Sequence, residues 1–317
     1  MIRPLLAVLG QVLLVLLFSP LISGFSRKLK ARLQSRKGPA MLQPYRDLYK
    51  LLRKGMVVPQ TASWIFPATP YVLFATTLLA GLLIPTVTTQ APLSAIGGVL
   101  AVVYLLALGR FFLALAGLDA GSSFGGLGSS REMTISAIAE PALMLAVFTV
   151  ALGAASTNLS SMAQAAVGQS WQFLAPSQML AFAALFIVLI AETGRIPVDN
   201  PATHLELTMI HEAMILEYSG PHLALVEWSA AMKQMVLMTL LINVFFPYGL
   251  SATGSLAAAA GSVALFVLKL GALALAVVLV ETGNAKMRLF RVPELLALAF
   301  VLSALALISS FLFGGRG

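Results

Sequence analysis

Long apolar stretches recur along the chain and are separated by shorter polar segments. A helix needs about 20 mostly apolar residues to cross the hydrocarbon core of a bilayer. Runs of that size lie at roughly 4–23, 66–87, 93–117, 134–153, 177–194, 225–247, 254–281 and 291–313. The pattern predicts an all-α fold: a polytopic membrane protein with about eight transmembrane helices. Because the segments between the runs are short, we expect a single integral membrane domain over residues 1–317.

The first apolar run has a second interpretation, because a signal peptide also combines a basic start with an apolar core. Here Arg3 is the only charge in front of the run, and no convincing small-residue cleavage site follows it. The run also continues directly into a basic segment. We therefore expect it to be a retained transmembrane helix.

The composition agrees with a membrane protein and narrows the chemistry. Of the 317 residues, 59% are hydrophobic and 10% are charged, whereas soluble domains carry about 25% charged residues. These values exclude an ordinary soluble enzyme and a disordered chain. The chain has no Cys, so it cannot supply thiolates to an iron–sulfur cluster, a disulfide or a Cys-ligated zinc ion. Any redox cofactor must then belong to partner subunits.

The net charge of +8 is concentrated in a few segments. The segment 24–65 holds ten Lys and Arg residues against one acid, Asp47. Charged segments at 24–65, 118–133, 195–224 and 282–291 alternate with segments that carry no charge. Positively charged loops face the cytoplasm, so we predict that both termini lie outside, in a multi-pass protein of the cell inner (plasma) membrane. The basic loop then sets the topology near anionic headgroups, and we expect no nucleic-acid partner.

Ionisable side chains also lie inside the apolar runs, where an unpaired charge is costly. They are Arg110, Glu140, Glu192, Glu227, Lys233, Lys269 and Glu281. Such groups either pair to hold helices in register, or line a hydrated path and exchange protons. Because they recur in several runs, we favour a polar internal axis, with the acids and both lysines as proton- or ion-path candidates. Glu227 and Lys233 are six residues apart, about 240° around a helix, so we expect them to face different partners.

The densest polar sequence follows the fifth run and reads Glu192-Thr-Gly-Arg195-Ile-Pro197-Val-Asp199. Its prolines predict an extended turn. An amphipathic segment over 202–216 comes next, and its acids and histidines suit a polar cytoplasmic cavity. His204 and His211 would share a helical face, but a separation of about 10 Å is too long for one metal ion. We therefore expect no metal site.

The segment 118–133 is rich in glycine. It follows an apolar helix and not a strand, so it is not a dinucleotide-binding loop. We expect a tight turn that places Arg131 and Glu132 at the mouth of the fourth span.

Several fragments point together to one family. They are Arg36-Lys-Gly-Pro39, Leu42-Gln-Pro44, Asp47-Leu-Tyr-Lys50, Arg110-Phe-Phe, Leu118-Asp119-Ala-Gly-Ser, Gly128-Ser-Ser-Arg131-Glu132, Glu140-Pro141, the polar sequence after the fifth run, and Glu217-Tyr-Ser-Gly220. In this order, and with eight spans, they resemble subunit 1 of respiratory complex I and its relatives in membrane-bound group 4 nickel–iron hydrogenases, including the formate hydrogenlyase type. The resemblance covers nearly the whole chain.

Two departures distinguish the branches of that family. Only Ala40 and Met41 separate the Gly-Pro pair from Leu-Gln-Pro, where complex I members carry an insertion, and this shortening resembles the hydrogenase branch. Complex I members also continue the polar loop with three alternating Glu, whereas the matching positions here are Ala202, His204 and Glu206. These differences fall where the complex I family builds its quinone chamber.

The resemblance implies a membrane anchor and coupling subunit that is not catalytic alone. Its implied partners are peripheral iron–sulfur and hydrogenase-like large and small subunits, antiporter-like membrane subunits that move protons or sodium, and the lipid bilayer. Those partners would hold the iron–sulfur clusters and a nickel–iron centre. The implied docking and cavity residues are Arg36, Arg46, Asp119, Arg131, Glu132, Arg195, Asp199, Glu206 and Glu217.

Other functions remain open at this point. One is the quinone-chamber subunit of an NADH:quinone oxidoreductase. Another is a free-standing secondary ion transporter, which predicts paired inverted halves with broken helices that we do not find in the sequence. An enzyme acting on a lipid-linked substrate needs clustered Asp for metal and phosphate, but Asp occurs only at positions 47, 119 and 199.

Overall fold

The computed structural model describes residues 2–167, 175–200, 209–250 and 256–313, and this part of the chain is helical without strands. The longer helices are α1 (Ile2–Leu33), α3 (Ile65–Leu83), α4 (Val99–Asp119), α5 (Ser123–Gly153), α7 (Pro176–Glu192), α9 (Gly220–Phe245), α10 (Leu256–Gly283) and α11 (Val292–Phe313). The shorter ones are α2 (Gln43–Leu52), α6 (Leu159–Val167), α8 (His211–Ile215) and the 3-10 turn η2 (Leu289–Arg291).

The predicted all-α membrane fold is confirmed. Each of the eight apolar runs overlaps one of the longer helices. Seven of these helices are long and apolar enough to cross a bilayer, and the eighth, α7, is a shorter apolar helix of 17 residues. The sides on which the two termini lie stay a prediction.

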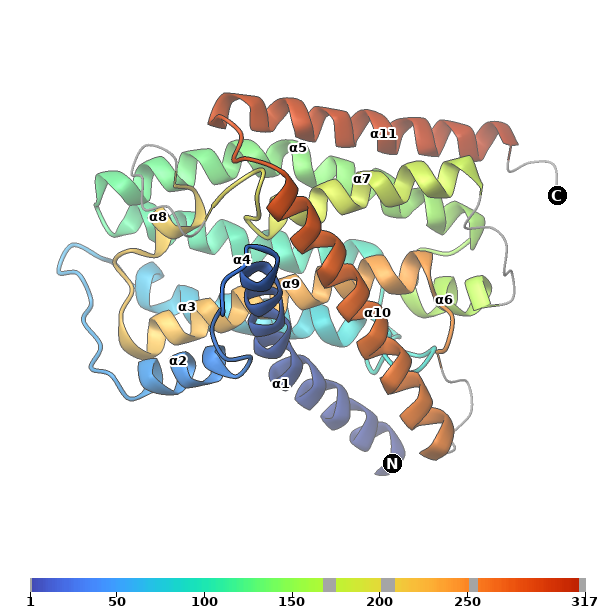
Figure 1. The fold of residues 1–317 in the computed structure, drawn as a ribbon, viewed down its shortest axis with the longest axis horizontal. Helices are drawn as coiled ribbons and strands as arrows, with labels where there is room; N and C mark the ends of the chain where they lie inside the picture. Colours follow the sequence, from blue (N-terminus) through green and yellow to red (C-terminus); the bar gives the residue numbers. More distant parts are fainter. Residues whose placement is uncertain (1, 168–174, 201–208, 251–255, 314–317) are drawn as a thin grey trace.

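Helix α9 lies at the centre of the bundle and contacts α1, α3, α7 and α10. Helices α4 and α5 extend the bundle beyond α3, and α11 lies along α5 and α7 (Figure 1). Most of the α9 side chains from Met232 to Phe245 are buried, which is the pattern of a helix surrounded by others. A side chain in this part of α9 therefore faces the protein interior.

The glycine-rich segment differs from its prediction as a loop over 118–133. Helix α4 runs to Asp119, and α5 already begins at Ser123, where the Ser122 hydroxyl accepts a hydrogen bond from the Gly125 amide at 3.1 Å. A Cβ added at Gly125 would collide with the backbone carbonyl of Gly117, and one added at Gly128 would lie 2.9 Å from the Ile210 carbonyl oxygen. These glycines are thus packing positions at helix crossings, where small residues let backbones approach.

The basic segment 24–65 is also more helical than a loop. Helix α1 continues to Leu33, and α2 packs against α1 and α9 with Pro44 and Leu48 buried. The predicted amphipathic segment 202–216 is described only from residue 209, where α8 occupies part of it, and residues 201–208 lie outside the described part. The polar loops therefore become short helices packed on one end of the bundle.

Candidate functional site

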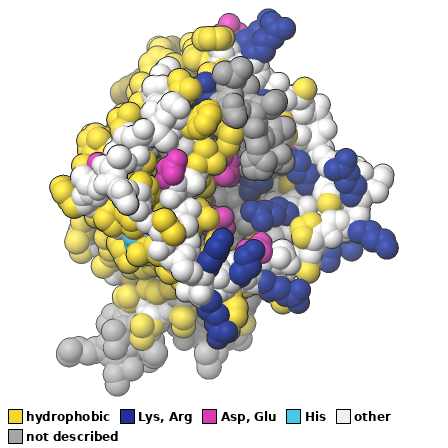
Figure 2. Space-filling view, turned by 90° about the vertical axis from the view of Figure 1, so that its left-hand side faces the viewer, with side chains coloured by type: hydrophobic (Ala, Val, Ile, Leu, Met, Phe, Trp, Pro, Cys, Tyr) yellow, Lys and Arg dark blue, Asp and Glu magenta, His cyan; other side chains and the backbone are white. Residues whose placement is uncertain are grey.

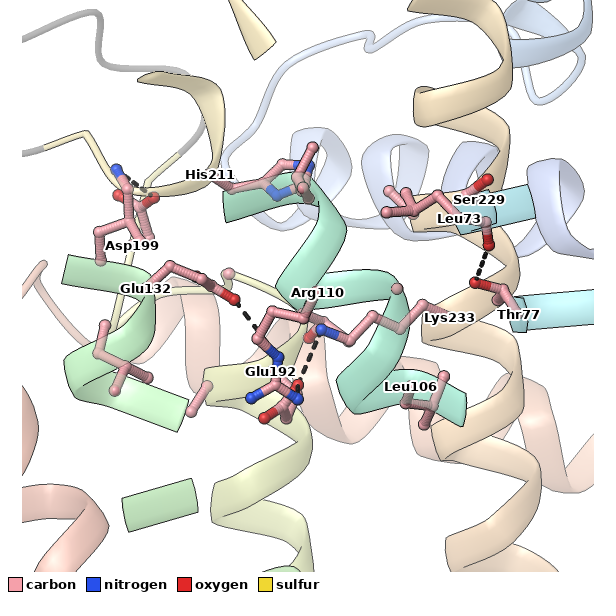
Figure 3. Close-up of a pocket in the computed structure, with 18 of the residues that line it drawn as sticks. Leu73, Thr77, Leu106, Arg110, Glu132, Glu192, Asp199, His211, Ser229 and Lys233 are labelled. Atoms are coloured by element: carbon pink, nitrogen blue, oxygen red, sulfur yellow. Dashed lines mark hydrogen bonds and ion pairs between the residues drawn. The ribbon is translucent and has the colours of Figure 1, made fainter. Parts of the chain in front are cut away.

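A buried arginine organises the polar interior. Arg110, on α4, is only 7% exposed. Its guanidinium nitrogens lie 2.9 Å from Glu192 Oε2, 3.1 Å from Glu140 Oε1 and 3.8 Å from Glu132 Oε1. Figure 3 shows Arg110 between the Glu132 and Glu192 side chains. Sequence reasoning singled out Glu132, Glu140 and Glu192 separately, and the structure brings them to one cation.

Lys233 joins the same group from α9. Its Nζ lies 2.8 Å from Glu192 Oε2, the oxygen that also contacts Arg110. We call Arg110, Glu132, Glu140, Glu192 and Lys233 the inner cluster. Its two cations and three carboxylates carry a formal charge of −1 when all are ionised. One carboxylate is therefore not balanced within a largely buried group.

A cavity of about 80 Å³ adjoins the inner cluster and is lined by Arg110, Glu132, Glu192 and Lys233. Within the described residues, Nε and Nη1 of Arg110 are buried and have no hydrogen-bond acceptor. Glu132 Oε1 is too far from Nε, at 3.8 Å, and Glu140 Oε1 lies 3.1 Å from Nη1 as an ion pair only. A water molecule needs about 10–15 Å³ and two to four polar partners. The cavity has the size and polar lining for a few waters.

A second cluster lies at the same end of the bundle, centred on Glu281 of α10. Glu281 is 3% exposed, and its carboxylate lies 3.0 Å from Lys30 Nζ and 3.2 Å from Arg195 Nη1. Arg195 also donates a 2.7 Å hydrogen bond to Gln234 Oε1. We call Lys30, Arg195, Gln234 and Glu281 the second cluster. With two cations and one carboxylate, its formal charge is +1, opposite to that of the inner cluster.

The end of α7 connects the two clusters. Glu192 is the last residue of the helix, and Gly194 follows with φ +58°. The Arg195 amide donates to the Ile190 carbonyl at 3.0 Å, and the Gly194 amide donates to the Ala191 carbonyl at 3.1 Å. This is the Schellman pattern of a helix C-terminus, which favours glycine at the left-handed position. The turn sends Glu192 into the inner cluster and Arg195 into the second.

Asp199 secures the segment that follows. It is 3% exposed, lies 2.8 Å from Lys286 Nζ, and accepts a hydrogen bond from the Ile210 amide at 3.3 Å. Arg131 adds a 2.7 Å hydrogen bond from Nη1 to the Met209 carbonyl. These contacts hold residues 195–199 and 209–210 against α5 and the end of α10.

A second cavity, of about 200 Å³, lies between α1, α2, α8 and α9. Its charged lining residues are Arg27, Asp47, Arg195, Asp199, Glu212 and Glu227. Glu227 therefore faces this cavity, whereas Lys233 pairs with Glu192. The prediction that these two α9 residues have different partners is confirmed.

Two other predicted residues lie away from both clusters. Asp119 accepts hydrogen bonds from the Ser63 and Phe66 amides at 2.8 and 3.2 Å, so it stabilises the start of α3. Lys269 donates to the carbonyls of Phe246, at 2.6 Å, and Tyr248. The structure thus places Lys269 at the turn after α9, and among the described residues no carboxylate pairs with it. A further predicted residue, Glu206, lies outside the described residues.

The remaining predicted docking residues, Arg36, Arg46 and Glu217, are exposed. Figure 2 shows the end of the molecule that carries α2 and the polar loops. Lys and Arg side chains gather over one part of this face, and hydrophobic side chains cover another. Such a mixed, strongly basic face is a candidate for contact with a partner surface.

The Glu217-Tyr-Ser-Gly220 fragment joins this face to the bundle. Tyr218 stacks on Phe66 with ring centroids 4.1 Å apart and donates to the Phe66 carbonyl at 2.9 Å. Burial raises the pKa of the Tyr218 hydroxyl above its usual value, so it stays a donor at neutral pH. Ser219 accepts from the Val57 amide at 2.9 Å, and Gly220 has φ +55°. The fragment fixes the loop between α2 and α3.

Sequence reasoning missed two members of these arrangements. Lys30 is one of ten cations in the basic segment, so nothing in the sequence distinguishes it. Gln234 is neutral and follows Lys233 directly on α9. His211 belongs to the segment 202–216, whose acids and histidines are expected to suit a polar cavity, and it lines both cavities. Among the described residues, no group of three or more His, Asp and Glu side chains is placed to hold a metal ion.

A family model and two known proteins match nearly the whole chain. A family model described as NADH dehydrogenase matches residues 6–312. Hydrogenase-4 component C of Escherichia coli (strain K12) is 35% identical over 299 residues, covering 94% of this chain and 93% of that protein. Formate hydrogenlyase subunit 4 of the same organism is 33% identical over 299 residues, covering 94% and 96%.

A solved structure has the same fold. It is a chain in the structure of the membrane-bound sulfane sulfur reductase (MBS), an archaeal respiratory membrane complex. The TM-score is 0.85 at 22% identity, covering 96% of this chain and 99% of the other. At that identity the similarity establishes the arrangement of helices.

Proposed function

The chain belongs to the NADH dehydrogenase family, and from this premise we propose that it is the membrane anchor and coupling subunit of a group 4 hydrogenase-like oxidoreductase complex. It docks a peripheral electron-transfer arm at its polar end and links electron transfer there to the movement of protons or sodium. Because the chain has no Cys, the iron–sulfur clusters and the nickel–iron centre belong to hydrogenase-like large and small subunits. Antiporter-like membrane subunits and the lipids of the inner membrane are its other partners.

The inner cluster is the observation that carries the proposal. A largely buried set of charges with one carboxylate in excess attracts one proton or one other cation. The proton affinity of such a set responds to a charge change nearby, at about 1.4 kcal/mol for each pKa unit. Electron arrival in a docked partner is a charge change of this kind.

The segment after α7 supplies the physical link between docking and the cluster. Arg195 and Asp199 are fixed by Glu281, Lys286 and the backbone at residue 210. Glu192 stands only three residues before Arg195. A displacement of this segment by a docked subunit would therefore change the surroundings of Glu192, which holds both Arg110 and Lys233.

Two observations favour the hydrogenase branch over a quinone-reducing one. The hydrogenase relatives match along more than nine tenths of both chains at 33% and 35% identity. The short connection through Ala40 and Met41 also resembles that branch. We therefore assign the quinone-chamber role as the alternative.

The direct test is purification of the complex through an affinity tag on this chain, followed by identification of its subunits. The proposal predicts iron–sulfur and hydrogenase-like subunits, and hydrogen evolution from reduced viologen coupled to ion uptake by inside-out vesicles. Glu140→Gln should lower that uptake while the complex still assembles, and the exposed Glu294→Gln is the matched control.

Other outcomes would identify the alternatives. Quinone reduction by the purified complex would support the quinone-chamber role. A chain that purifies without partners and transports ions by itself would be a secondary transporter. Failure of the Glu140→Gln complex to assemble would show that Glu140 is structural.

A further inference from the structure

The two cavities share one wall, and this wall contains a histidine. Both are lined by Thr193, Gly194, Asp199, His211 and Ala230. The first cavity leads to the inner cluster, and the second opens between α1, α2 and α9. Figure 3 shows His211 on the loop side of the first cavity, away from Glu192 and on the same side as Asp199.

His211 is the shared side chain best suited to pass a proton through this wall. Gly194 and Ala230 have no ionisable group. The Thr193 hydroxyl donates to the Leu189 carbonyl at 2.7 Å. Asp199 is held by Lys286 and by two backbone amides, those of Asn200 at 2.8 Å and Ile210 at 3.3 Å. His211 is half-buried, and an imidazole ring has two nitrogens, so it can accept a proton on one side and release one on the other.

Charged groups line the two cavities on most of the elements around them. Helix α8 packs against α4 and α5, so Arg110 and Glu132 lie on the inner side. The full charged set lining the cavities is Arg110 and Glu132 on α4 and α5, Glu192 at the end of α7, Lys233 and Glu227 on α9, Arg27 and Asp47 on α1 and α2, Arg195 and Asp199 after α7, and Glu212 beside His211. Acids are present on both sides of the wall, so a proton has an acceptor at each end.

We propose that His211 is the proton relay between the second cavity and the inner cluster. This inference rests on the proposed function, because it supplies the route by which the inner cluster exchanges protons with the polar end. His211 lies at the boundary of the two cavities and belongs to neither charge cluster.

The relay step conserves protons and transfers no electrons. One imidazole nitrogen accepts a proton from water in the second cavity, forming a new N–H bond. The other nitrogen then loses its proton to water in the first cavity, which passes it to a carboxylate of the inner cluster. Rotation of the ring about its Cβ–Cγ bond then turns the remaining N–H towards the first cavity before the next transfer. Each passage forms one N–H bond and breaks one.

The test uses the assembled complex in inside-out vesicles, with His211→Gln and His211→Ala. Glutamine keeps hydrogen-bonding capacity but cannot take up a proton, so proton uptake should fall by about 100-fold, the lower end of the range for a positioned proton-transfer group. Imidazole added to the His211→Ala vesicles should restore uptake, because a small base can occupy the space left in the wall. Assembly on a native gel should be unchanged.

Two results would overturn the proposal. One is normal proton uptake by His211→Gln between pH 6 and 8. Another is loss of uptake in His211→Ala without rescue by imidazole, since that pattern identifies a structural role. If His211→Gln does not assemble, the His211→Ala rescue decides alone.

A parallel Glu192→Gln variant separates this inference from the proposed function. Reduced uptake in Glu192→Gln with normal uptake in His211→Gln would refute the relay alone. Normal uptake in Glu192→Gln would refute the role of the inner cluster, whatever His211 does.

Discussion

The inner and second clusters lie at the same end of the bundle and each adjoins a cavity, yet they differ in charge. The inner cluster has three carboxylates for two cations, and its Glu140 side chain is 35% exposed. The second cluster has two cations for one carboxylate, Glu281, which is 3% exposed. A surplus of negative charge suits proton exchange, whereas a buried carboxylate held between two cations suits positioning.

Ion pairs formed by residues that are close together in the chain can therefore have separate roles. Glu192 and Arg195 lie on one helix end, but the turn at Gly194 directs them to different clusters. The inner cluster is predicted to respond to protonation, and the second is predicted to hold the docking segment in place. Substitutions in the two clusters should therefore have different consequences.

The largest effect is expected for Arg110→Leu. It would leave three carboxylates with Lys233 as their only cation in the inner cluster. Removing one partner of a buried pair costs about 3–5 kcal/mol, so the amount of assembled complex on a native gel should fall sharply. The exposed Arg288→Leu is the control. Normal assembly of Arg110→Leu would show that the inner cluster is not held together by this cation.

A smaller loss of stability is expected for Glu281→Gln. The amide still accepts a hydrogen bond, and the two cations that it releases can reach water. Loss of a hydrogen bond to a charged group costs about 1.5–3 kcal/mol, so the thermal unfolding temperature of the complex should decrease while assembly persists. A loss as large as that of Arg110→Leu would remove the distinction between the clusters.

Arg195→Ala should slow turnover of the electron-transfer arm by up to about tenfold, equivalent to 1.4 kcal/mol. The substitution frees Glu281 Oε1 and Gln234 from Arg195 and loosens the segment before Asp199. Hydrogen evolution from reduced viologen measures the effect, and Arg195→Lys should retain more activity. Unchanged turnover in membranes would exclude Arg195 from the docking arrangement.

The smallest effect is expected for Lys269→Gln. An amide can replace the donor to the carbonyls of Phe246 and Tyr248, which lie at the turn after α9. Stability should change by no more than about 0.5 kcal/mol, and ion uptake should equal that of the unsubstituted complex. A strong loss of ion uptake would instead support the prediction from the sequence that Lys269 belongs to the ion path.

The helices were predictable because bilayer thickness imposes one length and one composition on every span. The glycine-rich segment was not, because small residues at a helix crossing and small residues in a turn have the same composition. Gly125 and Gly128 are required by the nearby backbones of Gly117 and Ile210, and neither contact is visible in the sequence.

The candidate site was predictable as a set of ionisable residues but not as pairs. Charges inside apolar runs identified Arg110, Glu140, Glu192, Lys233 and Glu281 as unusual. Their partners are far away in the chain: Arg110 and Glu192 are 82 residues apart, and Arg195 and Glu281 are 86 apart. Only the folding of the bundle decides which charges meet.

The number of ions moved for each electron transferred tests the central claim most directly, when Glu192→Gln and Arg195→Ala complexes are compared in the same vesicles. If the inner cluster exchanges protons and the second cluster positions the docking segment, Glu192→Gln should lower this ratio while electron transfer continues. Arg195→Ala should slow electron transfer and leave the ratio unchanged. An unchanged ratio in Glu192→Gln, or equal losses of the ratio in both variants, would contradict the separate roles of the two clusters.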